Sequence, residues 1–596
     1  MMASVSWKNV KRIIFFILLS VILLNCGNRH EPAVLNNVVI YNVQDSLCII
    51  HPFSTDEGFA AVVPHWWKDE DVRVKGNLDS VRINIYKTHV STLFINTQSG
   101  TMDFIHADKK NKEQAHAIFT TSDGIVQYDG KIKMHGRGNL TWSGEKKPYN
   151  IKLANKCTIL DLNKSKNYCL LANACDPTSL RNWVAFNVAE ELALPYPVKS
   201  EYITLYLNGC YAGLYMITNK VDVEKGAVDI YRLQKKTELQ NEKDLKDYKH
   251  YEIQDDQDCV VEKGYEIPND TGDVSGGYLL DLCYKAYAES KSGFIPQKDI
   301  PASLKYPKYA TPNQVRYIRR YFDESVDALA ANDGANPTTL KHFTEYIDVS
   351  SFVRYYMVQE ILMNLDGGRG SLIFYKDKGG KLFAGPIWDF DLALSTDDDI
   401  KLRNSVNAIV VANRKHIDGS PFILGYLVQH QEIQDSIRDI YKKSAKDIIR
   451  KYTTGELLEN KYQALSHDIK LNNMRWQINI DVREMVEQMK EKASARIDFL
   501  DELWEDRIYN ENNIVRLNIG MGTANGEAHN WEHEFYIKEK MALPVLPLVW
   551  EGKKNCGWYD YRTNTKYSGD SVKSPAHLYL KWEKMSLLEK LLRKIM

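Results

Sequence analysis

Apolar and polar positions between residues 371 and 384 predict a β-hairpin. Residues 371–376 are rich in β-branched and aromatic side chains, residues 377–380 (Asp-Lys-Gly-Gly) have the composition of a turn, and residues 381–384 can return as the partner strand. An antiparallel hairpin brings the chain before its first strand close to the chain after its second. We therefore expect residues on the two sides of this hairpin to meet at its open end.

Three acidic residues flank the predicted hairpin. Asp366 precedes it, and Asp389 and Asp391 follow it. Carboxylates held close together repel one another unless a cation lies between them, so we expect Mg²⁺ or Mn²⁺ to bind here. Ser371, the fifth residue after Asp366, adds a hydroxyl that can also bind Mg²⁺.

A second interpretation of the segment after the hairpin involves no site. Trp388, Phe390 and Leu392 alternate with the two acids, as in a strand with one buried face. The apolar side chains would then point inward, and both carboxylates would face water.

The same kind of pattern predicts elements along the rest of the chain and an α+β fold. Strands are predicted at residues 131–135, 146–153, 202–207, 211–217 and 276–281, with Asn208-Gly209 as a hairpin turn. Helices are predicted from Asp176-Pro177 to Leu192, from Thr311-Pro312 to Leu329, from about Ser351 to Asn364, and over most of residues 415–505. Residues 235–263 are dense in Lys, Glu and Asp, so we expect an exposed insertion there.

A glycine-rich loop separates two of these strands. It reads Gly-Arg-Gly-Asn-Leu-Thr-Trp from residue 136, and Lys147 and Lys152 follow it. Glycines let backbone N–H groups approach phosphate oxygens closely, and the planar guanidinium of Arg137 adds a matching fork. A glycine-rich hairpin with lysines is also a common turn, so the loop alone does not identify a site.

The N-terminal segment has the order of a bacterial secretion signal. Lys8, Lys11 and Arg12 precede an apolar run at residues 13–24, which is short for a membrane span. Leu-Leu-Asn-Cys closes the run and resembles a lipobox, in which Cys26 is lipidated and becomes the mature N-terminus. We expect a lipoprotein signal peptide at residues 1–25 and a membrane-anchored protein of the cell envelope, outside the cytoplasm. An anchor with an incidental cysteine is the alternative.

Length and composition suggest several domains. The chain has 596 residues, 44% of them hydrophobic and 26% charged, which is ordinary for globular proteins. The formal net charge of −1 gives no indication of a nucleic-acid partner. The cysteines after Cys26 show no metal-binding spacing, and the sequence does not determine their pairing. We expect a small β spacer domain at residues 26–90 and a main domain at residues 91–505.

Several motifs in the main domain, taken in order, resemble the spore-coat CotH kinase family. The resemblance extends over roughly residues 90–500 and is specific because the motifs occur in the family's order. They are Arg137 to Trp142 with Lys146-Lys147-Pro148-Tyr149, Asp176 with Leu180-Arg181-Asn182, Asn208-Gly209 with Gly213-Leu214-Tyr215, and Trp388-Asp389-Phe390-Asp391.

The resemblance implies an atypical protein-kinase-like fold that binds ATP and Mg²⁺ and phosphorylates Ser or Thr of a protein substrate. Asp366 would be the catalytic base, and Asp389 the principal metal ligand, with Asp391 and Ser371 beside it. Lys147 or Lys152 would bind the phosphates together with Arg137. Lys152 is favoured because Tyr-Asn-Ile-Lys is similar to the V-A-I-K strand of protein kinases.

Two departures from the family pattern keep a second function open. Leu140 replaces the family's Ser, and Asn219 stands where many members have Glu. The chain could therefore be a catalytically inactive kinase-like scaffold of the envelope. In a third reading Asp389-Phe390-Asp391 is the D-x-D motif of a metal-dependent glycosyltransferase, but the ordered motifs elsewhere argue against it.

The C-terminal region resembles one internalin-B-type repeat of bacterial surface proteins. The resemblance rests on Gly557-Trp558-Tyr559, Gly569-Asp570 and the run from Leu578 to Trp582. We expect a β repeat at residues 510–583. A short amphipathic helix at residues 584–596 should follow and dock on the protein.

Replacing the predicted lipidated cysteine should release the protein from membranes. In Cys26→Ser no thiol is left for the lipid, so we expect the protein to move from the membrane fraction to the soluble fraction. Fractionation of cells that express parent and variant measures this. Unchanged membrane association of the variant would contradict the lipobox.

Overall fold

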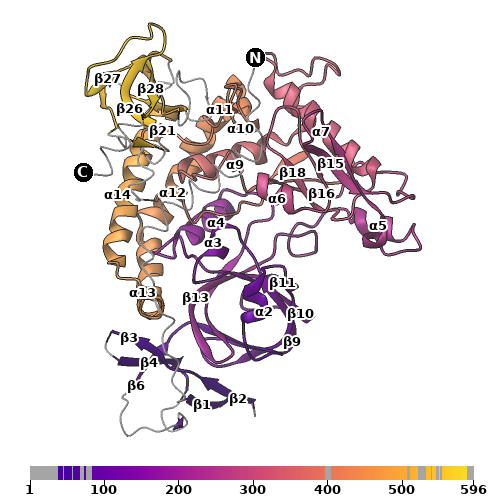
Figure 1. The fold of residues 1–596 in the computed structure, drawn as a ribbon, viewed down its shortest axis with the longest axis vertical. Helices are drawn as coiled ribbons and strands as arrows, with labels where there is room; N and C mark the ends of the chain where they lie inside the picture. The colour runs from indigo at the N-terminus through magenta and orange to yellow at the C-terminus, as the bar shows by residue number, and fades with distance from the viewer. Residues whose placement is uncertain are drawn as a thin grey trace.

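The computed structural model describes residues 38–43, 46–56, 58–67, 73–75, 83–368, 370–395, 405–505, 511–520, 532–537, 540–544, 549–550 and 553–586. Figure 1 shows a β-barrel with a second sheet above it and a layer of helices along one side. Helices and strands are mixed throughout, in agreement with the predicted α+β class.

A closed barrel forms the first large unit, with strands in the order β10-β11-β13-β12-β7-β8-β9. Its interior is apolar, and the short helix α2 closes one end by placing Ile105 in the barrel core. The predicted hairpin at Asn208-Gly209 is confirmed as β12–β13. The elements are β7 (Ser91–Thr97), α2 (Asp103–Ala107), β8 (Glu113–Thr120), β9 (Val126–Gly136), α3 (Leu140–Ser143), β10 (Tyr149–Cys157), β11 (Ser165–Leu171), β12 (Ser200–Leu207) and β13 (Cys210–Asn219).

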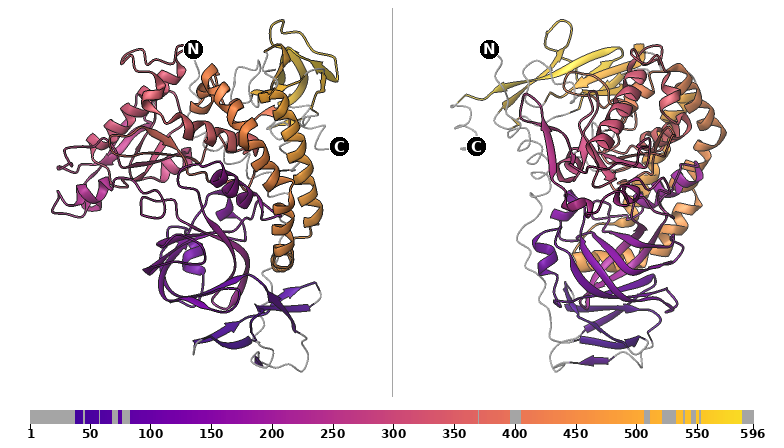
Figure 2. Two further views of the ribbon diagram at one scale, coloured as in Figure 1. Left: turned by 180° about the vertical axis from the view of Figure 1, so that it is seen from behind. Right: turned by 90° about the vertical axis from the view of Figure 1, so that its right-hand side faces the viewer.

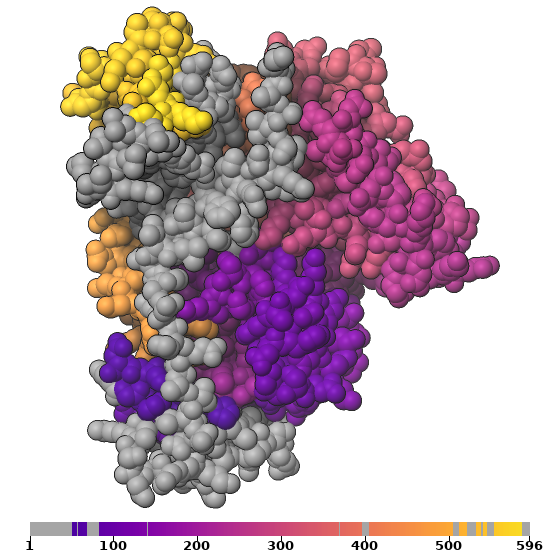
Figure 3. Space-filling view, in the orientation of Figure 1, coloured from indigo at the N-terminus to yellow at the C-terminus, as the bar shows by residue number. Residues whose placement is uncertain are grey.

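A sheet in the order β14-β15-β17-β18-β16-β19-β20 lies next to the barrel. The predicted hairpin is confirmed as β19–β20, in which Phe374 pairs with Ala384. Figure 3 shows the violet barrel and the magenta part of this sheet side by side on one face. The strands are β14 (His250–Gln254), β15 (Val260–Tyr265), β16 (Tyr278–Leu282), β17 (Gly293–Phe294), β18 (Ala302–Tyr306), β19 (Leu372–Lys376) and β20 (Leu382–Ala384).

Most of the predicted insertion at residues 235–263 is exposed as expected, but the prediction is wrong at its C-terminal end. Residues of β15 are part of the sheet, and Glu262 and Lys263 are buried. Each has a partner: Lys263 Nζ donates to the Tyr287 carbonyl at 2.6 Å, and Glu262 lies 3.5 Å from Arg319. Charged residues are tolerated inside when they are paired, so charge density alone did not indicate exposure.

Helices cover this sheet and run along the side of the molecule (Figure 2). The predicted start of α7 is confirmed by a capping box between Thr311 and Gln314. The predicted helix from about Ser351 is α9, and residues 415–505 are mainly helical as expected. The helices are α5 (Leu233–Glu238), α6 (Tyr284–Glu289), α7 (Pro312–Ala330), α8 (Phe343–Tyr346), α9 (Val349–Ile361), α10 (Ile423–Leu427), α11 (Gln431–Ile440), α12 (Lys446–Thr453), α13 (Glu456–Trp476) and α14 (Val482–Leu500).

Helix α4 (Arg181–Glu191) begins later than the sequence predicts. Asp176 does not cap a helix that starts at Pro177. Its carboxylate instead accepts hydrogen bonds from the Thr178 and Arg181 N–H groups, at 3.0 and 2.8 Å. Asp176 thus stabilises a turn before the helix. Asp side chains can form such a turn with nearby backbone N–H groups instead of capping a helix.

Small β units flank the two large ones. The N-terminal strands form two sheets, and Phe53 and Trp67 pack with Phe94 and Tyr206 of the barrel. Their bounds are β1 (Val38–Val43), β2 (Ser46–Ile50), β3 (Phe53–Thr55), β4 (Gly58–Pro64), β5 (Arg73–Lys75) and β6 (Ile83–Thr88).

The C-terminal strands share a core with the main domain. β21 comes from the main domain and pairs with β23, and Trp558 and Trp582 belong to the same apolar cluster as α9 and α14. The segment predicted as a repeat is therefore packed against the helices. The bounds are β21 (Ala408–Ile409), β22 (Ile514–Asn518), β23 (Glu532–Tyr536), β24 (Lys540–Ala542), β25 (Val549–Trp550), β26 (Lys553–Asp560), β27 (Ser571–Lys573) and β28 (Ala576–Lys584).

Some predictions fall outside the described residues: the signal peptide, Cys26, and most of the helix predicted at 584–596. Within the described residues, every helix is too short or too polar to cross a membrane. The described cysteines are free thiols at positions 157, 169, 175, 210, 259, 283 and 556.

Candidate active site

The segment after β20 carries Asp389 in an unusual backbone conformation. Asp389 has φ of 68° and Ser371 has φ of 53°, both in the left-handed region. The Ser371 hydroxyl donates a hydrogen bond to Asp389 Oδ2 at 3.1 Å, so the two ends of the hairpin meet as predicted. Residues held in left-handed conformations concentrate at functional sites, which makes this pair the starting point of a candidate site.

Asp391 is buried beside Asp389, with 8% of its surface exposed. Its pKa lies well above the usual 3.8, first because of burial and then because of the negative charges of Asp389, Asp366 and Asp176. The pKa of Asp389 is also raised by burial, although Arg137 and Ser371 oppose the rise. The three predicted acids are therefore close enough to affect one another's charge.

The interpretation in which both acids face water is wrong. Phe390 is fully buried, but Asp391 is buried as well, and Trp388 and Leu392 are only partly buried. The left-handed conformation of Asp389 breaks the strand alternation on which that interpretation depended.

Two residues at the start of α4 position the acidic segment. Asn182 Oδ1 accepts a hydrogen bond from the Phe390 N–H at 2.9 Å, and Arg181 Nη1 donates to the Asp391 carbonyl at 2.9 Å. The Arg181 guanidinium in turn lies 3.5 Å from the Asp176 carboxylate. The Leu180-Arg181-Asn182 motif therefore holds the backbone of the acidic segment in place. The sequence did not predict this role.

Asp366 lies in the turn that follows α9. Its N–H donates to Asn364 Oδ1 at 3.3 Å, and its carbonyl accepts from the Gly370 N–H at 3.0 Å. The Asn364 side chain also donates to the Asp389 carbonyl at 3.4 Å. One asparagine thus connects the turn that carries Asp366 to the segment that carries Asp389.

The glycine-rich loop between β9 and β10 reaches this site through Arg137. Its guanidinium lies over the Trp388 ring, 5.1 Å from the centroid, and its positive charge lowers the pKa of Asp389. Lys147 points elsewhere: its Nζ donates to the Trp142 and Gly144 carbonyls, at 2.9 and 3.0 Å. In this structure the Lys147 amine holds the loop together.

Lys152 is exposed on the outer face of β10, opposite Lys133 and Asn167. The Asn167 carbonyl accepts a hydrogen bond from the Lys220 N–H at 3.1 Å, so Lys152 and Lys220 lie in one row across the sheet with Asn167 between them. The structure records no contact between Lys152 and the three acids among the described residues.

The charges of Lys112, Lys220 and Lys291 act on Lys308, opposed by the charge of Asp222, and we call these four lysines the lysine cluster. The pKa of Lys308 is lowered by burial and then by the positive charges of the other three. Like charges held together in this way favour an anion between them. Sequence analysis missed the cluster, because its members come from four separate loops.

Two further residues connect the lysine cluster to the acids. Lys220 pairs with Asp222 at 2.8 Å, and the charge of Lys305 lowers the pKa of Asp222. Lys305 also lies 3.4 Å from Asp281, whose negative charge raises the pKa of Asp389. Asp281 Oδ1 is buried without a hydrogen-bond partner in the described part of the chain. Asp281 is the one acidic residue in the otherwise apolar strand β16, and this feature of the sequence could have identified Asp281.

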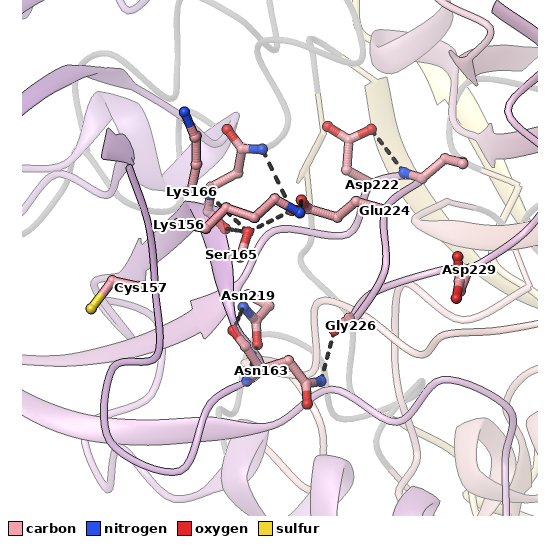
Figure 4. A network of polar contacts seen from close by, with 12 residues as sticks. Lys156, Cys157, Asn163, Ser165, Lys166, Asn219, Asp222, Glu224, Gly226 and Asp229 are labelled. Atoms are coloured by element: carbon pink, nitrogen blue, oxygen red, sulfur yellow. Dashed lines mark hydrogen bonds and ion pairs between the residues drawn. The ribbon is translucent and has the colours of Figure 1, made fainter. Parts of the chain in front are cut away.

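Asn219 has a structural role at the end of β13 (Figure 4). Its Oδ1 accepts from the Asn163 N–H at 3.0 Å, and its Nδ2 donates to the Asn163 carbonyl at 2.8 Å. Nearby, Glu224 accepts a hydrogen bond from Ser165 and pairs with Lys156 at 3.3 Å. Asn219 thus braces a loop and supplies no negative charge.

Comparison with protein families shows the family of this chain. The model of the family described as CotH kinase protein matches residues 134–500, which is more than half of the chain. The chain belongs to the CotH kinase family. A search of curated proteins found no match. The matched region includes Arg137, Asp176, Asp366 and Asp389, so the acids of this CotH protein lie within the part that defines the family.

The donor set fits a divalent cation. The described residues contain no group of three His, Cys, Asp or Glu side chains placed to hold a metal ion. Mg²⁺, however, is commonly held by one or two carboxylates, with water and substrate phosphates as its remaining ligands. Asp389 and Asp391, with the Ser371 hydroxyl, supply that kind of incomplete set.

The raised pKa values of the acid pair predict a pH dependence of stability. Above pH 3.8 the unfolded carboxyls have lost protons that folded Asp389 and Asp391 still hold. Unfolding then releases protons, so the free energy of unfolding falls as pH rises through the raised pKa values. Melting temperatures between pH 4 and pH 8 should show this fall in the parent and a smaller one in Asp391→Asn.

If the acid pair binds Mg²⁺, the ion should raise the melting temperature of the parent most at the upper end of this range, where the carboxylates are ionised. The exposed residue Asp498 offers a control, since Asp498→Asn should behave like the parent. Identical melting-temperature profiles against pH for the parent and Asp391→Asn would show that Asp389 and Asp391 do not cause the fall in stability.

Proposed function

We propose that this CotH protein is a cell-envelope-anchored atypical kinase that transfers the γ-phosphate of ATP to Ser or Thr of a protein substrate. The observation that supports the proposal is the position of the buried Asp391 and the partly buried Asp389 near positively charged residues. A divalent cation would neutralise the negative charge of the acids, and a polyphosphate would neutralise the positive charge of the lysine cluster. ATP with Mg²⁺ or Mn²⁺ combines both.

We assign a separate role in phosphoryl transfer to each residue around the acids. Asp366 would accept the proton of the substrate hydroxyl, since it is the acid that lies beside the metal pair without belonging to it. Mg²⁺ held by Asp389, Asp391 and Ser371 would neutralise charge on the phosphate oxygens. Arg137 would bind phosphate from the glycine-rich loop, and Arg181 and Asn182 would keep the acidic segment in place.

Lys152 and Lys147 are the proposed lysines for the phosphates. Lys152 is preferred because its side chain is exposed and lies in the row that includes Lys220, whereas the Lys147 amine is already bonded to two carbonyls. The lysine cluster provides the remaining charge. Attachment to the membrane would come from Cys26, and a formal net charge of −1 supports a protein substrate over a nucleic acid.

The alternative is a catalytically inactive scaffold of the envelope. It is favoured by Asn219, because both polar atoms of its side chain are bonded to Asn163 and no carboxylate is present at this position. A scaffold would keep the fold and the partner-binding surfaces without transferring phosphate.

Asp366→Asn separates the two functions. The amide keeps the size and most hydrogen bonds of the carboxylate but cannot accept the proton, and general-base catalysis contributes about 10²- to 10⁴-fold. We expect a near-normal melting temperature, retained ATP binding, and a loss of that order in phosphate transfer from labelled ATP to a Ser-containing acceptor. Equal labelling by parent and variant would remove Asp366 as the base, and absence of both labelling and ATP binding would favour the scaffold.

A further inference from the structure

A cavity of about 340 Å³ lies at the end of the barrel, apart from the acidic site. It is formed where the β12–β13 hairpin, the start of β10 and the C-terminal end of α13 meet, and Asp366, Asp389 and Asp391 do not line it. Its volume is in the range of small-molecule sites in proteins. Its apolar walls are Met102, Tyr149, Leu207, Tyr211, Tyr215 and Trp476.

Three residues of the cavity lining carry buried polar atoms without partners. The Tyr211 hydroxyl, Asn208 Nδ2 and His51 Nδ1 are buried and have no hydrogen-bond partner among the described residues. Tyr211 is 1% exposed. Its neighbour Tyr206 is as deeply buried but donates its hydroxyl to the Val62 carbonyl at 2.8 Å. Unsatisfied buried groups are costly and rare, so several of them around one cavity indicate a ligand.

The cavity also carries an excess of positive charge. Arg475 lies over the rings of Phe53 and Trp476, at 5.5 and 4.8 Å, and its Nε donates to the Tyr211 carbonyl at 2.9 Å. Its guanidinium forms no ion pair with a carboxylate in the described part of the chain. Lys147 lines the opposite side, and Glu145, which is exposed, is the acid in the lining. Burial lowers the pKa of His51 and of His106, so both rings are neutral at neutral pH.

We propose that this cavity binds a small ring compound that carries one carboxylate or phosphate group. The anionic group would pair with Arg475, and the ring would lie against the aromatic walls, where Tyr211 and Asn208 can donate to its oxygens. An anion would give the Arg475 guanidinium an ionic partner, and the flat aromatic surface favours a ring over a flexible chain. The site is independent of the proposed kinase activity.

Binding of defined probes tests the site. We would titrate the full chain with glucuronate, glucose 6-phosphate and benzoate, and with glucose as the uncharged control, using calorimetry. We expect saturable binding of at least one anionic ring and none of glucose. The carboxylate and phosphate probes also distinguish the two kinds of anion. Arg475→Gln should weaken binding about tenfold or more, because a charged hydrogen bond is lost.

Two tyrosine variants separate an effect on ligand binding from an effect on folding stability. Tyr211→Phe removes a hydroxyl that has no protein partner, so it should weaken ligand binding without lowering the melting temperature. Tyr206→Phe, the matched control, should lower the melting temperature and leave the affinity unchanged. Asp389→Asn should also leave the affinity unchanged, which separates this site from the acidic one. Failure of every anionic ring to bind, or equal affinity in the parent, Arg475→Gln and Tyr211→Phe, would overturn the proposal.

Discussion

The cost of keeping the carboxylates of Asp389 and Asp391 away from water is the constraint on which the rest of the site depends. Burial is the largest cause of the raised pKa of both residues, and the negative charge of Asp389 adds to the rise at Asp391. The surrounding structure fixes the backbone of both residues through Asn182 and Arg181, while Ser371 supports one side chain. The protein therefore maintains an arrangement that is costly in the absence of a cation, as expected of a site that binds one.

Charge is distributed so that negative and positive groups lie in sequence between the two large units. The acid pair is followed by Asp281 and Lys305, and then by the lysine cluster. A divalent cation bound to a polyphosphate has the complementary order of charges. Arg137 belongs to the barrel and Asp281 to the sheet, so both units contribute charge to this region.

Local patterns in the sequence predicted the elements that carry the acids but not all their surroundings. The β19–β20 hairpin and α7 were predictable because turn residues and capping residues act on their neighbours. The start of α4 was not, because Asp176 has two local ways to use its carboxylate and tertiary contacts select one. The lysine cluster and the support from Arg181 depend on distant segments that come together only in the folded chain, so no local pattern could reveal them.

Binding of MgATP to the full chain tests the central claim most directly. If the acid pair holds a cation that binds the phosphates, calorimetry should detect saturable binding of ATP with Mg²⁺. It should also detect clearly weaker binding of ATP without the metal. Asp389→Ala should then lower the affinity for MgATP to the level of ATP alone. Equal affinity with and without Mg²⁺, or no loss of MgATP affinity in Asp389→Ala, would contradict the account.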